Sequence, residues 1–166
     1  MSIKIFRNLV NAPKGATLLV DNLDSFTENI AQKIAILGSD VVVLEGRPEN
    51  HEDPAKKVDL WINQLKPSRI ILGPGPARPE ASPITMEIAR RGISGRLTDG
   101  SMTIPLLGLC LGHQAIGRAA GWNLIESPLG AVHGKPSVTI NDGTGLYSNL
   151  DKEIVMMRYN SLVLSP

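Results

Sequence analysis

The apolar positions of this chain fall into two alternating patterns. Short apolar runs rich in β-branched residues predict buried strands, and between them apolar residues recur at helical spacing. The predicted strands cover residues 17–20, 41–44, 69–72 and 105–109. Strands that alternate with helices and are apolar along their whole length favour a parallel sheet. We therefore predict an α/β fold with a doubly wound, mostly parallel sheet and flanking helices.

Capping residues indicate where the helices begin. Ser25 and Glu28 have the spacing of a capping box, which predicts a helix start at this point. Pro54 is expected at the first position of a second helix, and Ser82 is expected to cap a third. A fourth helix is predicted over residues 111–120.

The pattern changes after residue 121 to segments that resemble strands. These segments are residues 122–126, 136–140 and 154–159. Asn141-Asp142-Gly143 is a turn signal between two of them, and a polar loop containing glycines is predicted at residues 92–103. No repeat or linker is visible, so we expect an N-terminal extension at residues 1–16 and one domain at residues 17–166.

Composition and charge narrow the class of protein. The 166 residues suffice for a sizeable core, and 42% hydrophobic with 20% charged residues is typical of soluble globular proteins. The formal net charge of +1 indicates neither a nucleic-acid surface nor a basic membrane patch. No apolar run approaches the roughly 20 residues that span a bilayer, and no secretory signal is recognisable. Cys110 is the only cysteine, which excludes an internal disulfide and favours a cytoplasmic protein.

Two unusual segments follow predicted strands, at the sheet edge where doubly wound proteins bind ligands. They are Gly73-Pro74-Gly75-Pro76 and Gly108-Leu109-Cys110-Leu111-Gly112-His113-Gln114. The glycines two positions before and after Cys110 have the spacing of a nucleophile elbow. A helix N-terminus favours the thiolate, the amide of Leu111 can donate to an oxyanion, and Gly75 is placed to supply a second donor. The alternative is that Cys110 is a small buried side chain and the glycines serve packing alone.

The segment around Cys110 resembles the signature of the class I (triad) glutamine amidotransferases. Other segments resemble, in the same order, the glutaminase subunits of anthranilate synthase and aminodeoxychorismate synthase. They are residues 20–27, 73–79, 133–137 and 158–162. The resemblance runs from about Leu18 to the last residue, and it implies the family fold with an incomplete C-terminus.

The resemblance also implies roles for individual residues. Cys110 would attack the side-chain amide of glutamine, form a γ-glutamyl thioester and release ammonia. The amides of Gly75 and Leu111 would form the oxyanion hole. The residues that would hold glutamine are Ala77, Gln114, Ser161 and Leu162. His113 would be structural, because it lies on the helix behind the nucleophile.

A partner follows from the same resemblance. The ammonia would pass to a chorismate-binding synthase subunit in a hetero-oligomer, with no nucleic-acid or membrane partner. No cofactor is implied, and the sequence has no cluster of metal-ligating residues, so any Mg²⁺ would belong to the synthase subunit. The anthranilate and aminodeoxychorismate branches both remain open.

Several positions depart from the family pattern. Ala77 stands where glycine is usual, Asn160 stands where histidine is usual, and the loop at residues 92–103 is longer. The family's catalytic histidine and glutamate lie in a His-Pro-Glu-Ser-like segment that this chain does not contain. The histidines outside the family's pattern for a base are His51, His113 and His133. General-base assistance is worth about 10²–10⁴-fold, so we expect this chain alone to hydrolyse glutamine weakly or not at all.

Two other classes of protein fit parts of this pattern. A degenerate amidotransferase could act as a non-catalytic module that binds a partner or senses glutamine, which would explain Asn160 and the missing catalytic pair. A response-regulator-like or flavodoxin-like domain would fit the alternation of strands and helices, but it would leave the elbow at Cys110 unexplained.

Overall fold

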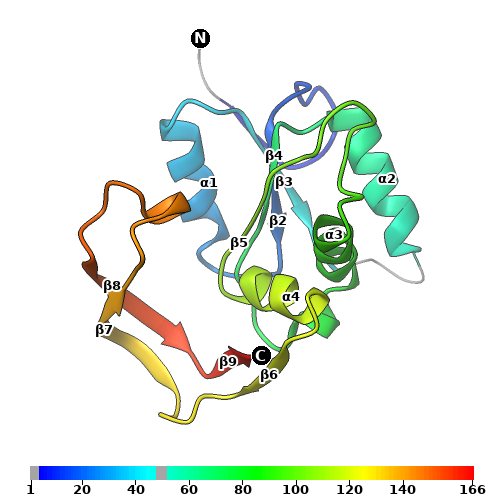
Figure 1. Cartoon of the computed structure of the whole chain (residues 1–166). Coiled ribbons are helices and arrows are strands. Elements are labelled where there is room, and N and C mark those ends of the chain that lie inside the picture. Colours follow the sequence, from blue (N-terminus) through cyan, green and yellow to red (C-terminus); the bar gives the residue numbers. More distant parts are fainter. Residues whose placement is uncertain (1–3, 48–51) are drawn as a thin grey trace. The chain divides into compact units, whose positions relative to one another are not determined.

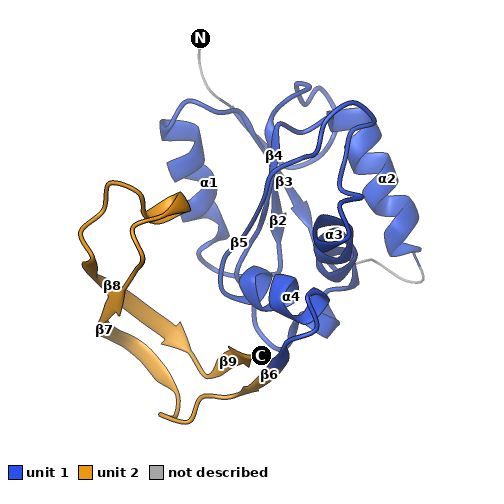
Figure 2. Cartoon of the chain, viewed as in Figure 1, with its two compact units in different colours: residues 1–123, 166 blue, residues 124–165 orange. Residues whose placement is uncertain are grey.

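The computed structural model describes residues 4–47 and 52–166. The chain forms two compact units, one comprising residues 1–123 with residue 166 and the other residues 124–165 (Figure 2). His51 lies outside the described residues. Within these residues no helix has both the length and the apolar character needed to cross a bilayer.

The first unit is built on a five-stranded sheet in the order β1-β3-β2-β4-β5 (Figure 1). Neighbouring strands of this sheet pair in parallel. The strands are β1 (Ile5–Phe6), β2 (Thr17–Asp21), β3 (Val41–Glu45), β4 (Arg69–Leu72) and β5 (Leu106–Gly108). The predicted doubly wound parallel sheet is therefore confirmed. Strand β1 is an addition, because two residues within the predicted N-terminal extension were too few to give a periodic pattern.

Helices cover both faces of this sheet (Figure 1). They are α1 (Thr27–Ile36), α2 (Pro54–Leu65), α3 (Pro83–Ile93) and α4 (Leu111–Ala119). Successive residues of β2 point to opposite faces. Leu19 packs in a cluster with Ala31 of α1, whereas Leu18 and Val20 pack in the larger cluster with apolar residues of the other helices. This arrangement places the carboxyl ends of β2, β4 and β5 at one edge, where the site described below is built.

The predicted capping box at Ser25 is wrong. Helix α1 begins at Thr27 with Phe26 at the N-cap, and no side chain caps it. The loop before the helix is instead held by Asp21, whose Oδ1 accepts hydrogen bonds from Leu23 N at 2.9 Å and Thr27 Oγ1 at 2.7 Å. The start of α1 is therefore organised by an aspartate at the end of β2 and not by Ser25.

The other two predicted helix starts lie where expected, but only one is capped by a side chain. Asp53 accepts a hydrogen bond from Ala55 N at 2.9 Å, and Pro54 opens α2. Ser82 occupies the N-cap of α3, yet its side chain makes no capping bond, and its buried hydroxyl has no partner among the described residues. The predicted cap at Ser82 is therefore correct in position and wrong in its hydrogen bond.

The loop predicted at residues 92–103 begins inside α3, which continues to Ile93. Asp99 organises the rest, since its Oδ1 accepts hydrogen bonds from Met102 N at 2.9 Å and Ser101 N at 2.9 Å. These bonds, led by that of Met102, lower the pKa of Asp99 to about 2. The loop is thus tied into a turn by one carboxylate.

The second unit consists of two separate pairs of strands. Strand β7 (Val132–Ile140) pairs antiparallel with β8 (Glu153–Asn160), and β6 (Asn123–Glu126) pairs with β9 (Leu162–Ser165). Three of these strands were predicted with different bounds, and β9 was missed.

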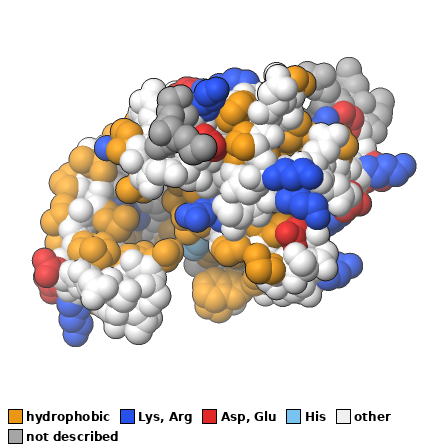
Figure 3. Space-filling view, turned by 90° about the horizontal axis from the view of Figure 1, so that it is seen from above, with side chains coloured by type: hydrophobic (Ala, Val, Ile, Leu, Met, Phe, Trp, Pro, Cys, Tyr) orange, Lys and Arg blue, Asp and Glu red, His pale blue; other side chains and the backbone are white. Residues whose placement is uncertain are grey.

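Apolar side chains form part of the surface of the chain (orange in Figure 3). In the hairpin, Val138 and Val155 face each other across the strands and are 61% and 72% exposed.

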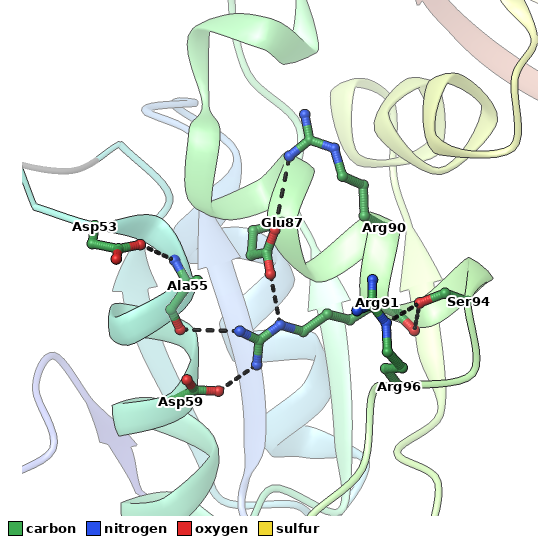
Figure 4. A network of polar contacts seen from close by, with 8 residues as sticks. All are labelled: Asp53, Ala55, Asp59, Glu87, Arg90, Arg91, Ser94 and Arg96. Atoms are coloured by element: carbon green, nitrogen blue, oxygen red, sulfur yellow. Dashed lines mark hydrogen bonds and ion pairs between the residues drawn. The ribbon is translucent and has the colours of Figure 1, made fainter.

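Helices α2 and α3 are joined by a polar network centred on Arg91 (Figure 4). Its guanidinium donates to Glu87 Oε1 at 2.8 Å, to Asp59 Oδ1 at 2.5 Å and to the carbonyl of Ala55 at 3.1 Å. Only 15% of the Arg91 side chain is exposed, so water could not readily satisfy its partners if these hydrogen bonds were lost. Partial burial lowers the pKa of Arg91, but the bonds to Asp59 and Glu87 outweigh it and the net pKa is raised.

Replacing Arg91 by methionine should weaken the packing of α2 on α3. The change removes the donors to Glu87, Asp59 and the carbonyl of Ala55 and leaves the partly buried Glu87 with only the longer contact to Arg90, which should lower the free energy of unfolding by about 1–3 kcal/mol. Urea denaturation followed by circular dichroism measures this. Arg90→Met is the matched control, because Arg90 is 58% exposed and lies 3.8 Å from Glu87. Its effect should stay within about 0.5 kcal/mol. Equal losses for the two variants would contradict this account.

Candidate active site

Two loops meet at the carboxyl ends of neighbouring parallel strands. Strand β4 leads into the Gly73–Ala77 segment, and β5 leads into Cys110; the two strands pair with Leu72 opposite Gly108. The Leu109 N–H donates to the carbonyl of Leu72 at 2.9 Å, and the Gly112 N–H donates to the carbonyl of Gly73 at 3.2 Å. The two segments that stood out in the sequence are therefore joined directly by backbone hydrogen bonds.

Cys110 has a backbone conformation that side-chain-bearing residues rarely adopt. Its φ is +51° and its ψ is −108°, at the N-cap of α4. Such a conformation costs on the order of 1–3 kcal/mol and persists only where the surroundings enforce it. The residue is exposed. A strained, accessible thiol between a strand and a helix N-terminus is the geometry expected of a nucleophile elbow.

Close packing of the flanking glycines enforces this turn. A Cβ on Gly112 would lie 2.1 Å from the carbonyl oxygen of Leu72, and a Cβ on Gly108 would lie 2.5 Å from the carbonyl carbon of Gly112. Neither position has room for a methyl group, because the neighbouring atoms belong to the backbone. The tight approach of α4 to β4 therefore depends on glycine at 112, and its approach to β5 depends on glycine at 108.

The thiol of Cys110 receives opposing influences from its surroundings. The largest influence is the partial removal of water from the thiol, which raises the pKa of Cys110 above its usual value. The backbone N–H groups of Leu111 and Gly75 act to lower this pKa, whereas the negative charge of Asp24 acts to raise it. These two amides are the ones that the sequence predicts as oxyanion donors, and that role stays a prediction.

The Gly73–Ala77 segment carries its own strain at Ala77, where φ is +68°. A left-handed conformation of this kind suits glycine and costs an alanine about 1–2 kcal/mol. At the other side of the segment, Arg47 Nη2 donates to the carbonyl of Pro76 at 3.2 Å. The departure from the usual glycine at Ala77 therefore has an energetic cost.

The remaining predicted glutamine-binding residues lie in both units. Gln114 is 9% exposed on the first turns of α4, in the first unit with Cys110, Gly75 and Ala77. Ser161 and Leu162 belong to the second unit. Their role in holding glutamine stays a prediction.

The histidines have separate surroundings. His113 is exposed on α4. His133 lies in the second unit, where its Nε2 is 3.1 Å from Ser161 Oγ. Asn160, the unusual residue beside Ser161, accepts a hydrogen bond from Arg158 Nε at 3.1 Å and donates to the carbonyl of Leu162 at 3.3 Å. His133 and Asn160 therefore both brace the strand end that carries Ser161 and Leu162.

Sequence reasoning assigned no role to Asn22 or Asp24, although both lie in a segment that resembles the family. Asp24 acts on the thiol by charge, and Asn22 is fully buried behind the Gly73–Ala77 segment. The available signal was their position directly after a buried strand, at the sheet edge that binds ligands in doubly wound folds.

Fold and site together define the class of protein: a doubly wound α/β domain with a cysteine at a strand-to-helix elbow. Residues 18–166 match the family described as "Glutamine amidotransferase class-I". The chain belongs to this family.

Relatives in this family share the sequence over most of the chain. Aminodeoxychorismate synthase component 2 of Escherichia coli (strain K12) is 37% identical over 149 residues, which are 90% of this chain and 71% of the relative. Anthranilate synthase component 2 of Porphyra purpurea is 37% identical over 147 residues, 89% of this chain and 69% of the relative.

A solved structure shares the fold at lower sequence identity. It is the crystal structure of a glutamine amidotransferase from Thermotoga maritima, which has a TM-score of 0.63 at 14% identity. The match covers 99% of this chain and 63% of the Thermotoga maritima chain. The arrangement of strands and helices is therefore shared even where few residues are.

Replacing Asp24 by asparagine should make the thiol of Cys110 more acidic. The carboxylate raises the thiol pKa, so its removal should shift the pH profile of alkylation by iodoacetamide to lower pH and increase the rate at neutral pH. Asparagine keeps an oxygen for the hydrogen bond from Phe26 N. Asp40→Asn, just before β3 and at the opposite end of the sheet, is the control and should leave the profile unchanged. A shift to higher pH in the Asp24 variant would refute the charge effect.

Replacing Ala77 by glycine should stabilise the protein. Glycine removes the cost of the left-handed conformation but increases the conformational entropy of the unfolded chain. The net gain in the free energy of unfolding should be about 0.5–1 kcal/mol. Chemical denaturation measures it. Asn11→Gly serves for comparison, because Asn11 has a φ of +59° but asparagine tolerates this conformation, so a smaller change is expected. A loss of stability at Ala77 would mean that the residue is not strained in the folded protein.

Proposed function

We propose that this chain is the glutaminase subunit of a synthase that aminates chorismate. The observation that carries the proposal is the strained Cys110 at the start of α4, whose thiol pKa the backbone N–H groups of Leu111 and Gly75 act to lower. A thiol with two adjacent backbone donors suits attack on a carbonyl carbon, because the donors stabilise the negative charge that develops on oxygen.

The proposed reaction consumes glutamine and water. The Cys110 sulfur attacks the side-chain amide carbon, and the oxyanion of the tetrahedral intermediate is bound by the amides of Gly75 and Leu111. Collapse breaks the carbon–nitrogen bond, and ammonia leaves after its nitrogen gains the thiol proton. Water then cleaves the γ-glutamyl thioester, which returns the thiol and releases glutamate.

Recognition of glutamine is assigned to four residues on the strength of the family motifs. They are Ala77, Gln114, Ser161 and Leu162. Two observations support this assignment. Gln114 is nearly buried, and the His133 side chain holds Ser161 through one hydrogen bond. In the proposal, Asn160 keeps the strand end in place through its bond to Leu162, in place of the usual histidine.

Ammonia is proposed to pass to a chorismate-binding partner in a hetero-oligomer. The names of the relatives support this partner, since they are second components of anthranilate or aminodeoxychorismate synthases. These two relatives are equally similar to this chain, at 37% identity each, so their identity favours neither product. The shared chemistry is amination of chorismate by ammonia that the glutaminase releases.

Incubation with a glutamine-like chloroketone, followed by intact-mass spectrometry, tests the nucleophile. We expect one covalent adduct on Cys110, formed more slowly when glutamine competes, and none on Cys110→Ser. Glutamate release from this chain alone should be weak. The sequence lacks the family's catalytic histidine and glutamate, and general-base assistance of this kind is worth about 10²–10⁴-fold. Addition of the synthase partner would show whether docking raises the rate.

A folded protein that forms no adduct would favour the alternative, a non-catalytic module that binds a partner or senses glutamine. Asn160, in place of histidine beside Ser161, is the feature that motivates this alternative. In that case Cys110→Ser should leave binding of the partner and of glutamine unchanged.

A further inference from the structure

Asn22 is a buried polar residue whose side chain connects three separate segments. It follows β2 and is 0% exposed. Its Nδ2 donates to the carbonyl of Gly73 at 2.9 Å, and its Oδ1 accepts a hydrogen bond from Thr85 Oγ1 at 2.7 Å. Thr85, on the first turn of α3, is likewise 0% exposed. A buried amide that uses both ends in this way is held in one orientation.

Asn22 also packs directly on the predicted oxyanion donor. A Cβ on Gly75 would lie 2.5 Å from Asn22 Cβ and 2.6 Å from its carbonyl oxygen. The backbone of Gly75 therefore rests on Asn22 with no space for a side chain between them. Any movement of Asn22 would therefore move Gly75 and its backbone N–H group.

The carbonyl oxygen of Gly73 links this arrangement to the nucleophile elbow. It accepts the hydrogen bond from Asn22 Nδ2 and a second one from the Gly112 N–H at 3.2 Å. Asn22 thus holds the loop that carries one oxyanion donor, through an acceptor shared with the turn that carries the other.

We propose that Asn22, fixed by Thr85, is the positioning residue that sets the Gly75 N–H against the reacting thiol. Asn22 acts through Gly75, because a fully buried side chain cannot touch bound substrate. The inference rests on the proposed function insofar as the Gly75 N–H serves an oxyanion. A structural role alone would predict lower stability without a selective effect on acylation.

Two reactions of the same thiol separate these possibilities. Acylation by L-γ-glutamyl-p-nitroanilide passes through an oxyanion, and p-nitroaniline leaves with the thiol proton. Alkylation by iodoacetamide displaces iodide and forms no oxyanion. A misplaced Gly75 donor should therefore slow acylation by about 10- to 100-fold, somewhat less than complete removal of an oxyanion donor, and leave alkylation within about threefold.

Three variants define the test. Asn22→Asp keeps the shape but loses the donor to Gly73, and Thr85→Val loses only the hydroxyl that orients Asn22. Thr85→Ser keeps that hydroxyl and should restore acylation toward the wild-type rate. Should Asn22→Asp fail to fold, the comparison of Thr85→Val with Thr85→Ser still decides the question. Equal acylation rates in the wild type and a folded Thr85→Val or Asn22→Asp would overturn the proposal.

Hydrogen exchange provides a readout that does not depend on chemistry. Mass spectrometry of peptides covering residues 73–77 should show faster exchange in Asn22→Asp and Thr85→Val, with the β2 and β3 peptides unchanged. If wild-type protein is not acylated at all, the proposed function fails, but exchange still reports whether Asn22 holds the loop. Unchanged exchange at residues 73–77 would refute the positioning role in either case.

Discussion

The carbonyl oxygen of Gly73 is shared by two parts of the chain that lie far apart in sequence. The side chain of Asn22 and the backbone N–H of Gly112 both donate to it, at 2.9 and 3.2 Å. Around this acceptor, α4 approaches β4 so closely that the backbone of Gly112 fills the space beside Leu72. The strained turn at Cys110 and the course of the neighbouring loop both follow from this contact. The geometry around Cys110 is therefore a matter of backbone packing more than of individual side-chain contacts.

Much of the first unit could be predicted from local patterns. The strand at residues 69–72 and the helix that starts at Pro54 lie where the apolar runs and the proline indicated. The turn at Cys110 was recognisable because close backbone approach requires glycine two positions before and two positions after the cysteine. These features depend on residues near in sequence, which a single chain displays directly.

What escaped prediction depends on contacts between distant residues. Asp21, and not Ser25, organises the start of α1 through its bond to Thr27, and the capping pattern gives no sign of that contact. The role of Asn22 depends on Gly73 and Thr85, which lie 51 and 63 residues further along. Strand β9 had no separate pattern, because it follows β8 almost without a break. The strain at Ala77 likewise required a backbone angle and not only a residue type.

The short pairing of β1 has a consequence for handling the protein. Ile5 and Phe6 lie against Val41 and Val42, so the N-terminal segment covers part of one side of β3. Val41–Leu44 is an apolar, β-branched run of the kind that associates readily when its backbone is unpaired. Trimming residues 1–16 as a dispensable tail would turn β3 into an open sheet edge. A shortened protein would then tend to aggregate by pairing of β3 strands between copies, and to precipitate, even with every residue around the thiol intact.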